Sequence, residues 1–252
     1  MQRGITGPSL RQRFGLVVGL GAAALAGCAA NGGDEGLVVL KNVVPTATTG
    51  GCSFSSQATE TSLVRGALDV RAHTGYLFIA QLESRITALA GQESQRTIFT
   101  RGANVDISFS DPNLFSAAEL ADLNAKNALH FMAPFTAPLS PNGGITDVLF
   151  ELIPADVALA LDAKTTFSST VAQTSFTVVG DLAGGDVTSQ KFQYPVTVVS
   201  GGLVNELGAC STVSSSFTPR VGNPCNPGQD GIVDCCTDTN NHQVCPAKGT
   251  GM

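Results

Sequence analysis

The sequence predicts a mainly β protein, an antiparallel β-sandwich with one helix and a disulfide-rich C-terminal tail. Three observations predict this fold class. Apolar and polar residues alternate in several segments that Gly and Pro separate, a single segment carries strong helix signals, and four of the seven cysteines lie within residues 225–245. Because helical segments do not recur between the strands, the pattern argues against a parallel α/β sheet.

The first strand is expected at residues 37–44, an apolar run of strand length that Pro45 ends. Residues 46–56 are rich in Thr, Ser and Gly and contain Cys52. The domain would therefore open with a strand and a loop that a disulfide holds.

A period of two continues in residues 68–73. Alternate residues from Leu68 onward are apolar, whereas Asp69, Arg71 and His73 fall on the opposite face. We interpret this segment as a half-buried strand with a solvated polar face, and not as a catalytic cluster.

The next two segments also have strand character. Residues 76–89 begin apolar on both sides and become amphipathic, which predicts a central strand with an exposed continuation. In residues 104–110, Val105, Ile107 and Phe109 alternate with polar residues, a pattern that no helix could bury on one side.

One helix is expected at residues 116–129. Ser116 and Glu119 form a capping box ahead of an Ala- and Leu-rich segment. Residues 155–163 are compatible with a short helix or a strand, because their alanines favour a helix and their apolar spacing does not exclude a strand.

Two further strand signals complete the sandwich. Residues 145–153 alternate, and residues 176–198 are typical of a hairpin whose second strand contains Pro195. Because proline lacks a backbone donor, that strand is expected at a sheet edge or on a bulge. We predict an immunoglobulin-like or similar sandwich over residues 37–209 and a Cys-rich tail over residues 210–252.

Residues 1–27 have the composition of a secretory signal peptide: basic residues, an apolar run over residues 14–25, and small residues at the end. The apolar run is shorter than the about 20 residues that a transmembrane helix needs. The signal ends in Leu-Ala-Gly-Cys at residues 25–28, which resembles the lipobox of bacterial lipoproteins.

This resemblance implies that Cys28 is alkylated by diacylglycerol, that the chain is cut before it, and that the new amine is acylated. Each buried methylene contributes roughly 0.8 kcal/mol, so two or three acyl chains attach a protein permanently. Ala29 follows the cysteine where Asp would indicate inner-membrane retention, which favours the outer membrane. Residues 28–36 would form a flexible tether that reaches about 15 Å from either the periplasmic or the surface face.

Composition argues against a nucleic-acid partner. Removal of residues 1–27 takes away three of the 14 basic residues and none of the 20 acidic ones, which leaves a net charge of −9. An anionic surface repels phosphate backbones. The chain also has no Trp and only two Tyr, which lowers the expectation of an aromatic sugar-binding platform.

The cysteines other than Cys28 are even in number, as an oxidising compartment favours. They are Cys52, Cys210, Cys225, Cys235, Cys236 and Cys245. Cys52 and Cys210 flank the sandwich, so we expect a bridge between them. Cys235 and Cys236 are adjacent, and a mutual bridge would strain the peptide, so one is expected to bond with Cys225 and the other with Cys245. Which of the two bonds with which partner stays open.

Residues 226–235 resemble a shortened relative of the calcium loops of thrombospondin type-3 repeats. Calcium needs six or more oxygen ligands, and Gly228 stands where such a loop would supply a carboxylate. We therefore predict a disulfide-held turn without a metal or other cofactor, and name Asn226, Asp230 and Asp234 as the residues that would supply ligands if calcium bound.

The leading hypothesis for function is an outer-membrane-anchored envelope lipoprotein with a non-enzymatic binding or structural role. Its protein or polysaccharide partner is not identified by any motif, and no catalytic residues are predicted. One alternative is a surface adhesin or polysaccharide-binding module. Another is an envelope hydrolase with an acidic site built from Asp106 or Glu151.

Overall fold

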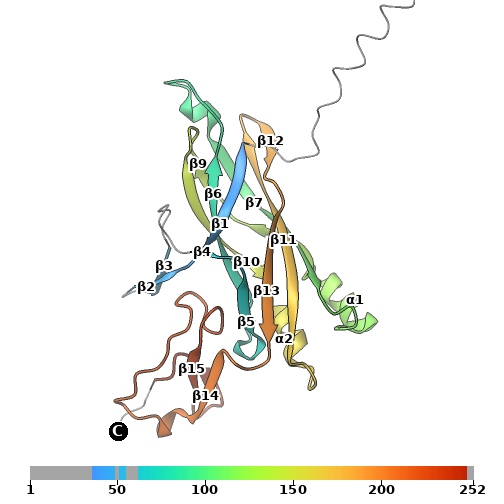
Figure 1. Cartoon of the computed structure of the whole chain (residues 1–252), viewed down its shortest axis with the longest axis vertical. Coiled ribbons are helices and arrows are strands. Elements are labelled where there is room, and N and C mark those ends of the chain that lie inside the picture. The colour runs from blue at the N-terminus through green and yellow to red at the C-terminus, as the bar shows by residue number, and fades with distance from the viewer. Residues whose placement is uncertain (1–35, 49–50, 55–61, 249–252) are drawn as a thin grey trace, which may run out of the picture. The chain divides into compact units, whose positions relative to one another are not determined.

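Two facing β-sheets enclose the main hydrophobic core in the computed structural model of the chain (Figure 1). The structure describes residues 36–48, 51–54 and 62–248. These residues belong to a compact unit that spans residues 33–252. The mainly β, sandwich-like class predicted from the sequence is confirmed.

The first sheet has four strands in the order β10-β6-β1-β4, all antiparallel. Its strands are β10 (Ile145–Ile153), β6 (Tyr76–Ser84), β1 (Leu37–Val43) and β4 (Ser62–Leu63). The predicted strands at residues 37–44 and 145–153 are thus neighbours of the predicted central strand. The expected exposed continuation of β6 over residues 85–89 is not a strand.

The second sheet has the order β5-β13-β11-β7-β8, and two short strands pair with β11 and β7. Its strands are β5 (Gly66–Asp69), β13 (Phe192–Val199), β11 (Ser169–Leu182), β7 (Ile98–Phe109), β8 (His130–Pro134), β12 (Gly185–Thr188) and β9 (Pro138–Leu139). β5 and β13 run parallel, whereas the other pairs are antiparallel. Buried and exposed residues alternate along β7, as its sequence predicted.

Aromatic rings join the two sheets in the core. Phe78 and Phe150 of the first sheet each lie against Phe176 of the second, with ring centroids 5.2 and 5.1 Å apart. Tyr194 lies 4.9 Å from Phe78 in an edge-on arrangement, which aromatic quadrupoles favour. Both tyrosines and these phenylalanines therefore pack in the core.

Two α-helices are present among the described residues, where one was expected. α1 (Ala117–Ala125) begins at the predicted capping box, in which the Glu119 N–H donates to Ser116 Oγ and the Ser116 N–H donates to Glu119 Oε2. α2 (Ala155–Asp162) occupies the segment that the sequence left open. It buries Val157, Ala158 and Leu161 on one side, so its apolar spacing suits a helix.

The predicted alternation over residues 68–73 is wrong beyond Asp69. β5 ends there, and the 3-10 helix η1 (Val70–Ala72) follows. Asp69 is fully buried, not solvated, and His73 has a left-handed backbone with φ of 53°. The alternation fails because backbone donors far along the chain surround the Asp69 carboxylate, as described below.

Pro195 also lies elsewhere than predicted. β13 is an interior strand between β11 and β5, and its pairing with β11 continues through Pro195 without a bulge. β5 pairs only with Val196–Val199, so Pro195 lies just beyond that pairing. A residue without a donor is tolerated there because one side of the strand is locally unpaired.

Residues 204–248 form a small sheet of their own, so the tail begins a few residues before the expected boundary at residue 210. β14 (Val204–Ala209) and β15 (Val233–Thr237) pair in parallel, and β16 (Gln243–Val244) pairs with β15. A separate hairpin, β2 (Thr46–Thr48) and β3 (Gly51–Ser53), carries Cys52. Two short 3-10 helices, η2 (Glu93–Arg96) and η3 (Cys210–Thr212), complete the described elements.

The disulfides correct the predicted pairing. They join Cys52 to Cys225, Cys210 to Cys236, and Cys235 to Cys245. Cys235 and Cys236 bond with separate partners, and the predicted bond to Cys245 is confirmed. The predicted bond from this pair to Cys225 and the predicted bridge between Cys52 and Cys210 are wrong. Successive residues of a strand point to opposite faces, so β15 directs Cys235 and Cys236 to different partners. The end of the parallel strand β14 brings Cys210 to the second of them.

Candidate functional site

The predicted lipid-attachment residue, Cys28, lies outside the described residues, as does the tether up to residue 35. Gly36 is the first described residue, and its carbonyl accepts a 2.9 Å hydrogen bond from the Arg85 N–H. Leu37 is fully buried at the start of β1. The sandwich therefore begins within about ten residues of Cys28.

A polar pocket of about 370 Å³ lies where the chain enters the sandwich. It is lined by Gly36, Arg85, Ile86, Thr87 and Arg96. Arg85 bonds to Glu83 through Nε at 3.2 Å, while Arg96 has no ion pair within the described part of the chain. Two guanidinium groups beside a hydroxyl can hold an anion such as a phosphate.

At the tail end of the sandwich, Asp69 is a buried carboxylate with four backbone donors. Its Oδ1 accepts from Arg71 and Gly201, and its Oδ2 accepts from Leu203 and Val204, at 2.9 to 3.1 Å. Burial opposes ionisation of Asp69, but these N–H groups outweigh it and lower the pKa. Asp69 thus fixes the chain between β13 and β14 as an anion.

Asp230 is a second buried carboxylate in this region. Its Oδ1 accepts from the Ala67 N–H at 2.7 Å, and its Oδ2 accepts from the Tyr76 hydroxyl at 2.8 Å. Burial raises the pKa of Asp230, and burial together with the Asp230 charge raises the pKa of Tyr76. Gly66 passes against the Tyr76 ring, where an added Cβ would lie 2.3 Å from the hydroxyl oxygen.

The hydrogen bonds continue from Tyr76 into the core. Tyr76 and Tyr194 hydroxyls lie 3.1 Å apart, and Asn42 Nδ2 donates to Tyr194 at 2.8 Å. Burial raises the pKa of Tyr194 to about 12. Both tyrosines are therefore neutral hydrogen-bonding groups at ordinary pH and not proton carriers.

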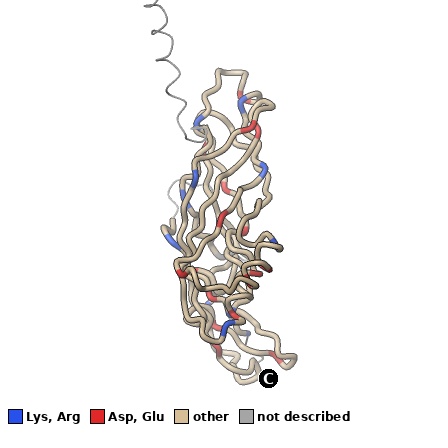
Figure 2. The backbone as a smooth tube through the Cα atoms, turned by 90° about the vertical axis from the view of Figure 1, so that its right-hand side faces the viewer, with Lys and Arg blue, Asp and Glu red and all other residues tan. Residues whose placement is uncertain are grey.

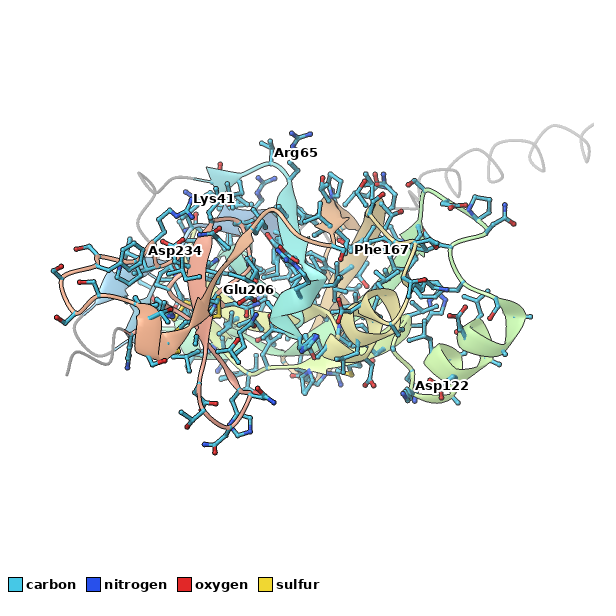
Figure 3. All side chains as sticks on the ribbon, turned by 90° about the horizontal axis from the view of Figure 1, so that it is seen from below. Lys41, Arg65, Asp122, Phe167, Glu206 and Asp234 are labelled. Carbon is cyan, nitrogen blue, oxygen red and sulfur yellow. A yellow bond between two sulfur atoms is a disulfide. The ribbon has the colours of Figure 1, made fainter. Side chains whose placement is uncertain are left out.

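The three residues named for calcium take part in internal contacts. Asn226 Nδ2 donates to the Gly75 carbonyl at 2.6 Å, and the Asp230 carboxylate accepts hydrogen bonds from Ala67 and Tyr76. Asp234, which Figure 3 shows on the small sheet near Glu206, is bonded by the Arg220 guanidinium and by Asn205. The Arg220 hydrogen bonds hold the pKa of Asp234 well below its usual range. Gln229 joins the first two in one hydrogen-bond network, because it accepts from Asn226 Nδ2 at 2.9 Å and donates to Asp230 Oδ2 at 3.1 Å, whereas Asp234 belongs to another.

The residues named for hydrolysis lie in different sheets. Asp106 is on β7, where it contacts His130 Nδ1 at 2.9 Å and Lys191 Nζ at 3.7 Å on an exposed face. Glu151 is on β10, and burial raises its pKa. Ser175 lies beside Asp106 in register, but on the side away from His130, so the order does not suit a Ser-His-Asp relay.

His73 forms an ion pair with Asp162, which is neither of the carboxylates named for hydrolysis. Its Nε2 contacts Asp162 Oδ2 at 2.8 Å, which joins the end of η1 to the end of α2. This pair connects two elements at the surface.

Another pocket, of about 550 Å³, lies between the segment after β7 and the segment after α2. Asp111 and Lys164 are its charged lining residues. Lys164 donates to Glu119 at 2.7 Å and lies over the Phe115 ring, while Figure 3 shows Phe167 near these segments. The Lys164 bond lowers the pKa of Glu119 to about 2. The charge of Lys164 is therefore already balanced by Glu119.

Within the described ranges, no three or more His, Cys, Asp or Glu side chains form a group that could hold a metal ion. In the same part of the chain, the helices are too short or too polar to cross a membrane. Basic and acidic residues occur over the whole described chain (Figure 2). Comparisons with protein-family models, curated proteins and solved structures give no match.

Sequence reasoning missed the roles of Asp69 and Asp230. The signal for Asp69 was an acidic residue between Leu68 and Val70 in a short apolar run. We interpreted it by period, whereas its partners at residues 201–204 lie 132 or more positions away. Such contacts leave no local pattern in the sequence.

Proposed function

We propose that the protein is a lipid-anchored component of the bacterial cell envelope, attached to the outer membrane through Cys28, with a non-enzymatic binding or structural role. The lipobox-like sequence at residues 25–28 carries the anchor, and the β-sandwich forms the part exposed to the envelope.

One observation supports the anchor most. The chain has seven cysteines, and the six others bond with one another in three disulfides. Cys28 consequently has no intrachain cysteine left to bond with, which suits a thiol that is consumed by alkylation with diacylglycerol. The disulfides also suit export, because they persist in oxidising compartments.

The arrangement of polar groups supports the non-enzymatic role. Asp69 and Asp230 are consumed by structural hydrogen bonds, and Asp106 and Glu151 lie in separate sheets. Catalysis by paired carboxylates needs both groups at one bond of the substrate. A sandwich surface that presents contacts to another envelope component fits these positions better.

Metabolic labelling with palmitate tests the anchor, followed by separation of inner and outer membranes. The wild type should incorporate label and fractionate with the outer membrane. Cys28→Ser should lose the label and become soluble in the envelope. Ala29→Asp should move the labelled protein to the inner membrane, and the matched Ala29→Ser variant should not.

Two results would count against the proposal. A Cys28→Ser protein that still needs detergent for release would show a different attachment. An unlabelled wild type would show that the resemblance to a lipobox is accidental.

A further inference from the structure

We propose that the pocket formed by Gly36, Arg85, Ile86, Thr87 and Arg96 binds the phosphate headgroup of a membrane phospholipid and places Leu89 in the bilayer interface. The inference rests on the proposed lipid anchor and extends it. The anchor holds the protein near the membrane, and this pocket would fix which end of the sandwich faces the lipid.

The length of the chain places the pocket near the membrane. Gly36 lines the pocket and is eight residues from Cys28. Eight residues span at most about 28 Å even when fully extended. A pocket that contains the attachment point of the tether is therefore within reach of the headgroups.

The pocket has the chemistry that a phosphate requires. Arg85, Thr87 and Arg96 are exposed and supply two guanidinium groups and one hydroxyl. Arg85 donates to Glu83 through Nε at 3.2 Å, and Glu93 is in the same loop as Arg96. Acidic and basic residues thus both occur at this end (Figure 2), so a single headgroup site is favoured over a broad basic surface.

An exposed apolar residue lies in the same loop. Leu89 is 74 % exposed at a turn in which the Gln92 N–H donates to the Leu89 carbonyl. Asn142 holds the base of this turn, because its side chain accepts from the Ala88 N–H at 2.9 Å and donates to the Ala88 carbonyl at 3.2 Å. The loop therefore presents Leu89 from a fixed base, as an interfacial contact requires.

The chain contains no Trp, so a single introduced Trp reports its own surroundings. The acylated protein with Leu89→Trp is reconstituted in vesicles of phosphatidylethanolamine and phosphatidylglycerol that carry brominated acyl chains. We expect a blue-shifted emission and at least twofold quenching. The matched control is acylated Ile232→Trp, at a residue that is 43 % exposed before β15 in the tail, and its emission should not be quenched.

The double variant Arg85→Gln and Arg96→Gln, in the Leu89→Trp background, tests the pocket. We expect the quenching to fall by at least half, whereas Arg65→Gln, on the turn between β4 and β5, should leave it unchanged (Figure 3). Quenching that is indifferent to the double variant would overturn the headgroup site.

Other results distinguish the remaining occupants. Inorganic phosphate tests for a site that binds free phosphate. If phosphate protects Arg85 and Arg96 from chemical modification, and vesicles do not quench Leu89→Trp, the lipid proposal is contradicted. A concentration-dependent blue shift without vesicles would indicate a second copy and also contradict it. Flotation of the protein with vesicles distinguishes the headgroup site from the lipid anchor. Flotation without quenching of Leu89→Trp contradicts only the headgroup site, whereas loss of flotation contradicts the anchor.

Discussion

Asp69 shows how one buried charge can define a junction between two parts of a fold. Its carboxylate is fully buried, and four backbone N–H groups surround it. Bonds from N–H groups to an ionised acceptor are stronger than bonds between neutral groups. The segment that leaves β13 for the tail is held at this carboxylate, so Asp69 connects β5 to the small sheet.

Replacement of Asp69 by asparagine should be strongly destabilising. The asparagine side chain would direct an NH₂ group at backbone donors, which leaves at least one buried N–H unpaired. We expect Asp69→Asn to lower the free energy of unfolding by about 3 kcal/mol. Urea denaturation measures it, and the exposed Asp186→Asn control should change the free energy by less than about 0.5 kcal/mol. An equal effect of both variants would contradict the role of Asp69.

Acid should destabilise the protein partly through Asp69. Its folded pKa is lowered, so its contribution is complete above the unfolded pKa of about 3.9 and is lost as the pH falls through the folded pKa. Asp234 acts in the same direction, and Asp230, whose pKa burial raises, acts in the opposite one. Between pH 5 and pH 2, the decline in urea midpoint should be shallower for Asp69→Asn than for wild type, and an identical decline would refute the linkage.

Among the helices and strands, the local sequence pattern predicted those elements whose formation depends on neighbouring residues. The strands β7 and β10 follow from period-two burial, β1 follows from an apolar run of strand length, and the start of α1 follows from its capping box. The position of β13 and the disulfide partners did not follow, because they depend on which segments meet across the chain. Residues 226–235 were interpreted as a disulfide-held turn or a calcium loop. A turn is present at residues 226–229, but its contacts with both sheets had no local signal in the sequence.

The disulfide pairing can be checked by partial reduction, alkylation and peptide mapping. We expect fragments that join Cys52 to Cys225, and separate partners for Cys235 and Cys236. The first bridge closes a separation of 173 residues, and its removal should cost up to about 5 kcal/mol in the chain-entropy treatment. A fragment joining Cys52 to Cys210 would contradict the fold of the tail.

At the scale of the molecule, the tail completes the sandwich. Gln229 bonds to both the N–H and the carbonyl of Leu77 on β6, at 2.8 and 2.7 Å. The neighbouring Gly228 and Asp230 bond to the backbone of β5. One turn thereby covers an open edge of the second sheet and joins it to the first, in the region where Figure 1 shows β5 above the tail.

Removal of the tail should therefore damage the sandwich as well. A chain that ends at Gly202 loses the donors to Asp69 from Leu203 and Val204 and exposes the edge of β5, so we expect aggregation in size-exclusion chromatography. The matched chain that ends at Lys248 keeps the contacts described here and should remain soluble. A soluble, cooperatively unfolding chain ending at Gly202 would show that the sandwich does not need the tail.

We propose that Cys28 is the lipid-anchored N-terminus of the mature protein. Mass spectrometry of the N-terminal peptide, from protein purified out of the membrane fraction, measures this directly. We predict a peptide that begins at Cys28 and carries the mass of diacylglycerol plus an amide-linked acyl chain. A peptide that begins elsewhere, or an unmodified Cys28, would contradict the account.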